Sequence, residues 1–232
     1  GLPAGLLSVI PGPGRTVGEA LVRHPGVAKV TFTGGTSTGR HLAHVAADKL
    51  MPITLELGGK SPTIVFDDAD IERALQGVLY GIFSSSGQSC IAGSRVFVHR
   101  SIFETFTNRL VERARKLRLG PGTDPRSDVA PMITRSHRDT VARMVDAAVD
   151  AGATVLCGGA VPTDGILADG AYYPPTVLTG VVNSDSICQE EIFGPVAVVL
   201  PFDDEDDLIA QANDSAYGLA CGIWTENYRR AL

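Results

Sequence analysis

The sequence predicts an α/β fold with a largely parallel sheet, and two observations support this. Short runs rich in β-branched residues alternate along the chain with longer segments that repeat apolar residues every three or four positions. The helical segments are also well delimited by residues that start or stop helices. Strands that alternate with helices favour crossover connections, which join parallel strands.

Eight short segments carry the strand pattern. They are bounded by turn-forming residues and are rich in Val, Ile, Thr and Phe. We expect strands over residues 29–33, 53–57, 63–66, 95–99, 154–157, 176–178, 196–201 and 221–225.

Helix starts are marked by capping residues. Ser101 with Glu104 forms the pattern of a capping box, and Asp70 precedes an apolar stripe that runs toward a cysteine-containing turn. A further helix is expected near Ser136 and is stopped by Gly152. The acidic run 203–207 is the pattern of a solvated first helical turn, where carboxylates complement the helix dipole.

Composition and charge exclude several classes of protein. The chain has 232 residues, 44% of them hydrophobic, and a net charge of −6, which describes a chain able to bury a core. We therefore expect no nucleic-acid partner and no anionic-membrane partner. No apolar run approaches the ~20 residues of a membrane span, and the first residues lack the charged start of a signal peptide. A cytoplasmic location is the expectation.

The cysteines and histidines signal no metal site. Cys90, Cys157, Cys188 and Cys221 form no CxxC pair, so neither zinc nor a disulfide framework is indicated. His41 and His44, the two histidines of HLAH, have a spacing that can bind a metal ion, but no further candidate ligands lie near them in the sequence.

Cys90 is the candidate nucleophile. It lies in SSSGQSCIAGSR, where Gly87 and Gly93 would allow a substrate to approach the sulfur. Glu56 stands in a strand-like run just before the glycines at 58–59, and a carboxylate there can act as a general base. Either residue alone has a plain structural explanation, but together they favour covalent catalysis.

Two further segments have the character of cofactor sites. In VTFTGGTSTGR, a strand, the glycines Gly34 and Gly35 and a helix that begins near Thr36 form a turn that can hold phosphate. It is neither GxGxxG nor a P-loop, so a plain strand-to-helix turn stays an alternative. In QEEIFGPV, Glu191 can accept the hydroxyls of a ribose and Phe193 can lie against a flat ring, while a capped loop is the other interpretation.

These segments occur together in an order that resembles a known family. TFTGGTSTGR, TLELGGKSP, GQSCIAGSR, EEIFGPV and NDSAYGLACGIWT look like the aldehyde dehydrogenase superfamily, and they span nearly the whole chain. The resemblance implies part of a Rossmann-type cofactor domain over 1–57, followed by an α/β catalytic domain over 58–232. It also implies oxidation of an aldehyde to a carboxylic acid with NAD or NADP.

The same resemblance implies roles for single residues. Cys90 would form a thiohemiacetal and then a thioester, and Glu56 would activate the water that hydrolyses it. The implied cofactor-binding residues are Gly34, Gly35, Gly39, Leu57, Gly58, Glu191 and Phe193.

The ends of the chain lead to expectations about its parent. The chain opens without methionine and closes in ENYRRAL, an incipient helix with no stop signal. We expect a longer parent that forms a homodimer or homotetramer, and weak activity of this chain alone. A cofactor-free thiol esterase and a non-catalytic fragment are the alternatives. The sequence leaves the aldehyde, and the choice between NAD and NADP, undetermined.

Overall fold

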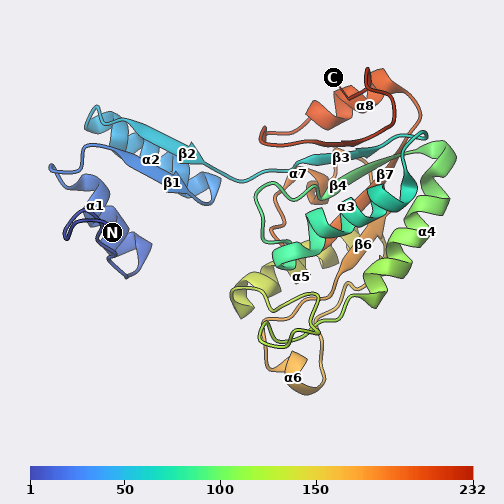
Figure 1. Cartoon of the computed structure of the whole chain (residues 1–232), viewed down its shortest axis with the longest axis horizontal. Helices are drawn as coiled ribbons and strands as arrows, with labels where there is room; N and C mark the ends of the chain where they lie inside the picture. The colour runs from blue at the N-terminus through green and yellow to red at the C-terminus, as the bar shows by residue number, and fades with distance from the viewer. Residues whose placement is uncertain (232) are drawn as a thin grey trace. The chain divides into compact units, whose positions relative to one another are not determined.

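The structure is a computed structural model that describes residues 1–231. Its internal contacts divide the chain into two compact units, Gly1–Gly58 and Gly59–Leu232 (Figure 1). The sequence-based division falls one residue earlier, and the roles assigned to its two parts remain predictions. Leu232, the last residue of the predicted second domain, lies outside the described residues.

The first unit contains a two-stranded parallel sheet. Strands β1 (Val30–Thr33) and β2 (Ile53–Glu56) pair in register over their full lengths. Helix α2 (Thr36–Asp48) connects them, and two short elements, η1 (Gly14–Gly18) and α1 (Glu19–Arg23), come before them. A crossover helix of this kind is what a parallel pair requires.

A small apolar cluster holds this unit together. Its buried members come from α1 and α2, and half-buried side chains of both strands pack against them; together they are Val22, Leu42, Val45, Val30, Phe32 and Ile53. Alternate residues of β1 and β2 take part because successive side chains of a strand point to opposite faces.

The second unit is built on a six-stranded sheet of order β5-β6-β7-β4-β3-β8. Every neighbouring pair is parallel except β5 with β6, so the largely parallel sheet is confirmed. The strands are β3 (Pro62–Val65), β4 (Arg95–His99), β5 (Thr154–Cys157), β6 (Thr176–Thr179), β7 (Val196–Phe202) and β8 (Gly222–Trp224).

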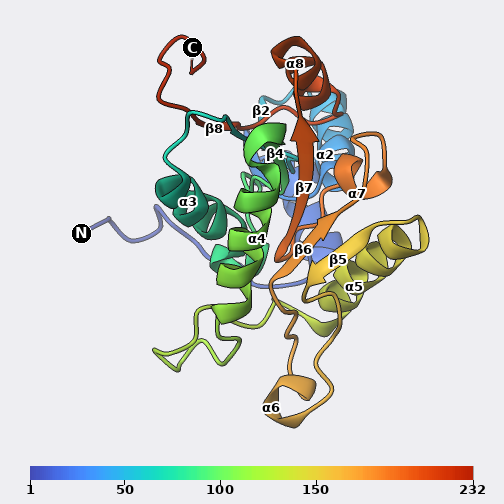
Figure 2. The same ribbon diagram turned by 90° about the vertical axis from the view of Figure 1, so that its right-hand side faces the viewer.

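Helices cover both faces of this sheet. In Figure 2, α3 and α4 lie on one side of β7, and α5 and α7 lie on the other. The helical elements are α3 (Ile71–Phe83), η2 (Ser84–Gly87), α4 (Arg100–Lys116), α5 (Arg135–Asp150), α6 (Gly165–Ala168), α7 (Ser186–Gln189) and α8 (Glu205–Asn213). Sheets covered on both faces have strands that are nearly continuous hydrophobic runs, as β7 is.

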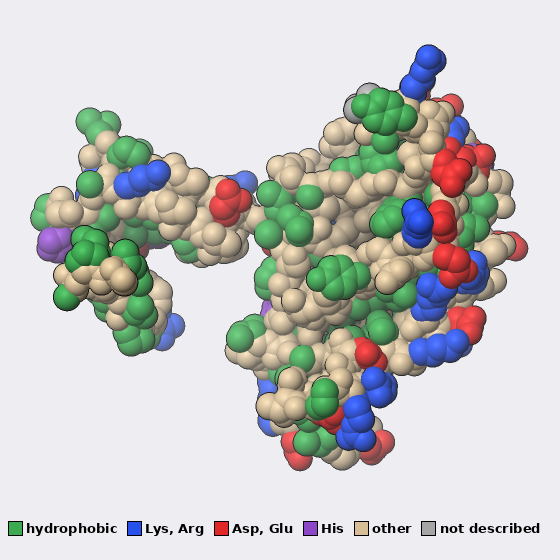
Figure 3. Space-filling view, in the orientation of Figure 1, with side chains coloured by type: hydrophobic (Ala, Val, Ile, Leu, Met, Phe, Trp, Pro, Cys, Tyr) green, Lys and Arg blue, Asp and Glu red, His purple; other side chains and the backbone are tan. Residues whose placement is uncertain are grey.

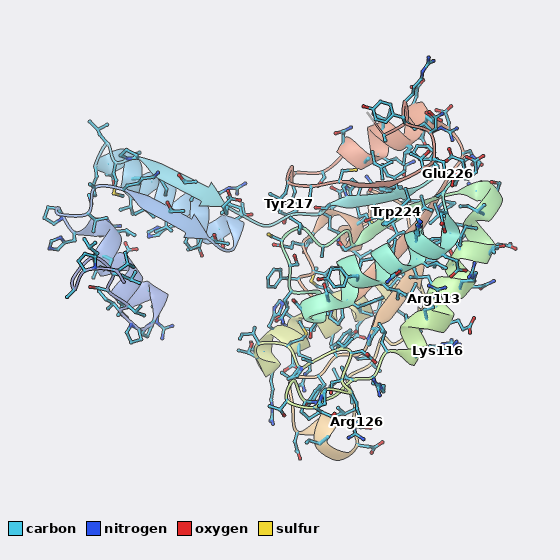
Figure 4. All side chains as sticks on the ribbon, in the orientation of Figure 1. Arg113, Lys116, Arg126, Tyr217, Trp224 and Glu226 are labelled. Carbon is cyan, nitrogen blue, oxygen red and sulfur yellow. The ribbon has the colours of Figure 1, made fainter. Side chains whose placement is uncertain are left out.

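Successive side chains of β7 point to opposite faces of the sheet and belong to two separate apolar clusters. Val196, Val198 and Leu200 pack with residues of α5, α7 and α8. Ala197 and Val199 point the other way and pack with residues of α3 and α4. The half-buried ring of Trp224 packs against this second cluster (Figure 4).

The predicted start of α3 is confirmed. Asp70 has an extended backbone, and its Oδ1 accepts the Arg73 backbone N–H at 3.1 Å. Such a cap satisfies one of the N–H groups that a helix start leaves without a partner.

We expect Asp70→Ala to lower the free energy of unfolding by about 1 kcal/mol, because the first turn of α3 loses this acceptor. Urea unfolding followed by the fluorescence of Trp224, the only tryptophan, measures the change. Asp206→Ala is the matched control, because Asp206 is an exposed acid in the first turn of α8 whose cap is Asp204. Equal losses in the two variants would contradict the assignment.

The predicted capping box at Ser101 is wrong. Helix α4 begins at Arg100, directly after β4, so Ser101 is already inside its first turn. The cap is His99, whose Nδ1 accepts the Ser101 backbone N–H at 3.3 Å. The strand continues to the residue before the helix, and the helix cap lies two residues earlier than the pattern suggests.

Charged side chains over α3 and α4 are of mixed sign (Figure 3). Arg109 and Arg113 both pair with Glu72, and Lys116 pairs with Glu112. The acidic run before α8 behaves as predicted, since Asp204 caps that helix through the Asp207 backbone N–H at 2.9 Å. None of the helices in the described part of the chain is long and apolar enough to span a membrane.

Candidate functional site

The turn between β1 and α2 leaves the first backbone N–H groups of α2 without a side-chain cap among the described residues. Gly34 donates its backbone N–H to the Glu56 carbonyl at 3.0 Å, which extends the pairing of the two strands by one residue. Gly35 then has an extended backbone, and no side chain among the described residues caps α2. A Cβ on Gly35 would meet open space. The N–H groups of the first turn are therefore free to receive an anion.

A cavity of about 740 Å³ lies beside this helix start. Ser37 and Thr38 bring the first turn of α2 to it, and the rest of its wall comes from η1, α1, β1 and the following turn of α2. Glu19 on its wall accepts hydrogen bonds from His41 at 2.7 Å and Arg23 at 2.5 Å, which lower the pKa of the Glu19 carboxyl. The sequence motifs did not indicate the part of the wall formed by residues 14–22.

Gly39 and Leu57 lie together in the first unit. Gly39 is buried in α2, and a Cβ at this position would collide with the Leu57 side chain. Gly39 therefore makes a packing contact with Leu57, because α2 passes close to this residue, which directly follows β2. A contact of either residue with phosphate remains a prediction.

Glu56 is exposed at the end of β2. It shares a face of the strand with Thr54, while Ile53 and Leu55 turn inward. Within residues 1–231 its carboxylate makes no hydrogen bond or ion pair, so the group is available to accept a proton. Gly58, the last predicted cofactor residue of this part, ends the first unit.

Cys90 lies in the turn that follows α3, as predicted. The chain leaves the helix through η2, where Ser85 and Ser86 have φ of 50° and 56°. Ser86 is buried and donates its hydroxyl to the Ala130 carbonyl at 2.6 Å, which holds this unusual backbone in place. Cys90 itself is half-buried, and across the described chain its backbone N–H has no intramolecular acceptor.

Three segments that are distant in sequence meet around Cys90. Gly87, with φ of +70°, packs so closely on the carbonyl of Gly194 that any side chain there would collide with it. A Cβ on Gly59 would strike the carbonyl oxygen of Cys90. The sequence predicts that these glycines allow close approach. They bring the loop that contains Cys90 against residues 58–60 and against residues 190–194.

Glu191 is part of the same arrangement. Its Oε1 accepts the Gly59 backbone N–H at 3.3 Å. Burial raises the pKa of the Glu191 carboxyl, while the Gly59 N–H, Lys60 and His137 oppose that shift. A half-buried carboxylate with one spare oxygen can still accept a hydroxyl.

Phe193 is held by a histidine that sequence reasoning missed. Phe193 has φ of 51°, and its carbonyl accepts the His137 Nε2–H at 2.7 Å. The two rings lie 5.9 Å apart, and Thr134 caps α5 through the His137 backbone N–H. The signal for His137 was weak, since it lies in a helix start 56 residues from its partner.

Two other thiols are poor nucleophiles. Burial raises the pKa of Cys188 to about 11 and also raises that of Cys157. Thiols in such surroundings hold little thiolate near neutral pH. Nor do the described residues contain a group of three or more His, Cys, Asp or Glu side chains placed to hold a metal ion.

Lys60, next to Gly59, is an unusual buried cation. It is 2% exposed, and no described residue accepts a hydrogen bond from its Nζ. Burial lowers the pKa of the Lys60 ammonium to about 7. Because the unfolded chain holds this proton up to a pKa of about 10.4, it binds more protons than the folded chain between the two values.

Lys60 should therefore make the free energy of unfolding increase as the pH rises from 7 toward 10. The slope of this increase should be up to about 1.4 kcal/mol per pH unit. Lys60→Met should remove this contribution. Urea unfolding at pH 7 and pH 9, followed by Trp224 fluorescence, measures it. Lys116→Met, an exposed lysine paired with Glu112, is the control. A pH dependence that Lys60→Met leaves unchanged would contradict the assignment.

Comparison with known proteins places this arrangement in a family. The model of the aldehyde dehydrogenase family matches residues 1–232. A betaine aldehyde dehydrogenase from Brucella anthropi is 47% identical over 230 residues, which cover 99% of this chain and 47% of that protein. The chain thus spans about half the length of the curated relatives that it matches.

Solved structures agree with this match. The NAD⁺ complex of an aldehyde dehydrogenase from Bacillus cereus is 43% identical with a TM-score of 0.91, over 95% of this chain and 44% of the other. A betaine aldehyde dehydrogenase from Staphylococcus aureus in complex with NAD⁺ is 42% identical with a TM-score of 0.92, over the same shares. The predicted fold class is confirmed, and the chain belongs to the aldehyde dehydrogenase family.

Proposed function

We propose that this chain carries the nucleophile, the general base and part of the cofactor site of an NAD(P)-dependent aldehyde dehydrogenase. The observation that carries the proposal is the half-buried thiol of Cys90, in a loop packed against Gly59 and the Glu191–Gly194 segment. Since the relatives are about twice as long, the activity is proposed for the longest chain that the gene encodes.

In the first step the Cys90 thiolate adds to the carbonyl carbon of the aldehyde. A carbon–sulfur bond forms, and the electron pair of the C=O double bond moves to the oxygen. The Cys90 backbone N–H, which has no intramolecular acceptor among the described residues, is the local donor for this oxyanion. The product of the step is a thiohemiacetal.

Each of the two units has residues that would suit one part of a dinucleotide. The open start of α2 suits the pyrophosphate, and the neighbouring cavity of about 740 Å³ is large enough for an adenosine group. Glu191 would accept hydroxyls of the nicotinamide ribose, and Phe193 would lie against the nicotinamide region. When bound, the cofactor supplies a hydride acceptor, which allows the thiohemiacetal carbon to become a thioester.

Glu56 is proposed as the general base of the last step. Its free, exposed carboxylate takes a proton from water, and the resulting hydroxide attacks the thioester carbon. The carbon–sulfur bond then breaks, the carboxylic acid leaves, and Cys90 returns to its thiol or thiolate form.

For the substrate we propose an aldehyde with a small or cationic group. Several relatives carry the name betaine aldehyde dehydrogenase, which makes betaine aldehyde the first compound to test. Ser89 and Ile91 flank Cys90, and Ile91 is exposed, so the immediate wall of the site is of mixed polarity. Assembly as a homodimer or homotetramer and a cytoplasmic location are also proposals, and gel filtration tests the first.

Aldehyde-dependent NADH formation tests the proposed function. Betaine aldehyde is compared with short aliphatic, aromatic and acidic aldehydes, each with NAD⁺ and with NADP⁺. Ester hydrolysis that does not need the cofactor, without NADH formation, would favour the thiol esterase instead. A folded protein with neither activity would favour the non-catalytic interpretation.

A further inference from the structure

One short segment, residues 130–137, is hydrogen-bonded to two separate parts of the proposed site. We call it the bridging segment. It contacts the cysteine loop, residues 84–90, and it also contacts Phe193. All of these residues belong to the larger unit, so the contacts lie within one compact part of the chain.

Two side chains of the cysteine loop bind the bridging segment. Ser86 is 2% exposed and donates its hydroxyl to the Ala130 carbonyl at 2.6 Å. Gln88, two residues before the thiol, accepts the Ile133 backbone N–H through its Oε1 at 3.0 Å. Its Nε2 donates to the Ser85 carbonyl at 3.4 Å. Gln88 therefore connects the backbone of the loop to the bridging segment.

The cysteine loop depends on such contacts because its backbone is unfavourable by itself. Ser85 and Ser86 have φ of 50° and 56°, a region that residues other than glycine seldom adopt. Such a conformation costs about 1–3 kcal/mol per residue and persists only where the surroundings hold it. Loss of the Gln88 contact should therefore let the loop, and the thiol with it, move.

Phe193 is held in a similar way at the other end of the bridging segment. It also has a positive φ, of 51°, and its carbonyl accepts the His137 Nε2–H at 2.7 Å. His137 is fixed in turn, because the Thr134 Oγ1 accepts its backbone N–H at 3.1 Å. Thr134 directly follows Ile133, which Gln88 holds. The cap of α5 thus joins the two points of attachment.

We propose that Gln88 and His137 are positioning residues, which act through the bridging segment to set the distance between the Cys90 sulfur and the nicotinamide side of the site at Phe193. This inference rests on the proposed function, in which hydride leaves the carbon bound to Cys90. Reacting atoms must lie about 3–3.5 Å apart, and a misplacement of about 1 Å can cost about 10²-fold in rate. Neither side chain has to touch substrate or cofactor for this role.

The rate of the first turnover, measured as NADH formation after rapid mixing, tests the role of Gln88. Gln88→Met has no acceptor for the Ile133 N–H, so we expect this rate to fall about 10- to 100-fold at saturating aldehyde and cofactor. Cofactor affinity should change by less than about twofold. Gln88→Glu keeps the acceptor and should stay within about fivefold of the unaltered protein.

The longest chain that the gene encodes is used, and Gln76→Met, at an exposed position of α3, is the matched control. Thermal unfolding of each variant is measured beside the rate. A contact that only stabilised the fold would lower Tm and leave the first-turnover rate of the folded protein unchanged.

His137 provides a second variant at the other end of the bridging segment. His137→Leu lacks the donor to the Phe193 carbonyl and should also slow the first turnover, whereas His137→Gln keeps an N–H and should restore part of the rate. Because both contacts act through the same segment, the double variant Gln88→Met/His137→Leu should lose less than the product of the two single losses.

Hydrogen exchange followed by mass spectrometry gives a readout that does not need turnover. In Gln88→Met, peptides that cover residues 84–90 and 130–133 should both exchange about tenfold faster, and Gln76→Met should leave them unchanged. Unchanged exchange, or a first turnover as fast in Gln88→Met as in the unaltered protein, would overturn the proposal. So would a Gln88→Glu rate as low as that of Gln88→Met. An unaltered protein that does not oxidise aldehydes would instead refute the proposed function, and this inference with it.

Discussion

Replacing Cys90 with alanine is expected to reduce aldehyde-dependent NADH formation by about 10³-fold or more, because the first covalent bond of the proposed reaction can no longer form. The longest chain that the gene encodes is assayed with saturating cofactor, and cofactor affinity is measured separately. We expect that affinity to be unchanged, since the cofactor contacts proposed above do not use the thiol.

Cys221→Ala is the matched control for this experiment. Cys221 is exposed, belongs to the same unit and is not part of the proposed site, so its loss should leave the rate within about twofold. Turnover that survives Cys90→Ala would eliminate the proposed mechanism. Equal loss in both variants would show that the assay reports folding and not the nucleophile.

Replacing Glu56 with glutamine is expected to slow steady-state turnover by about 10²- to 10⁴-fold, which is the usual contribution of a general base. The two earlier steps do not require Glu56 in the proposed mechanism. The variant should therefore still form about one equivalent of NADH in a rapid burst and then stop as the thioester. Stopped-flow absorbance of NADH measures the burst, and mass spectrometry detects the acyl group on Cys90.

Glu104→Gln controls for the loss of one surface carboxylate. Glu104 is exposed on α4 and is not part of the proposed site. We expect it to keep full turnover. A Glu56→Gln variant that loses the burst together with the steady-state rate would place Glu56 in an earlier step, and one that keeps full turnover would remove it from the mechanism.

Much of the fold could be predicted because its strands and helices carry local patterns. The strands over 95–99 and 154–157 were predicted to the residue, and α3 begins where Asp70 marks its cap. The error at Ser101 has a local cause as well. Strand β4 ends immediately before α4, and a pattern of helix-capping residues does not show how far the preceding strand extends.

The candidate site was predicted less completely. Cys90, Glu191 and Phe193 were singled out, and the structure brings their segments together within one unit. His137 was missed because its contact is a hydrogen bond to a backbone carbonyl far along the chain. The wall formed by residues 14–22 was missed because a cavity arises from the packing of several elements and leaves no periodic signal.

The sequence by itself determined the family, the α/β class with its mostly parallel sheet, and the chemical types present, namely a thiol among glycines and acids beside glycine turns. Only the tertiary structure decided which of these groups meet. It packs Gly59 against Cys90 and Gly87 against Gly194, and among residues 1–231 it leaves the side-chain donors of Lys60 and Ser61 buried without acceptors. The physical reason is that periodicity and capping depend on neighbours within one or two turns, whereas close backbone approach and burial depend on segments far apart in the chain.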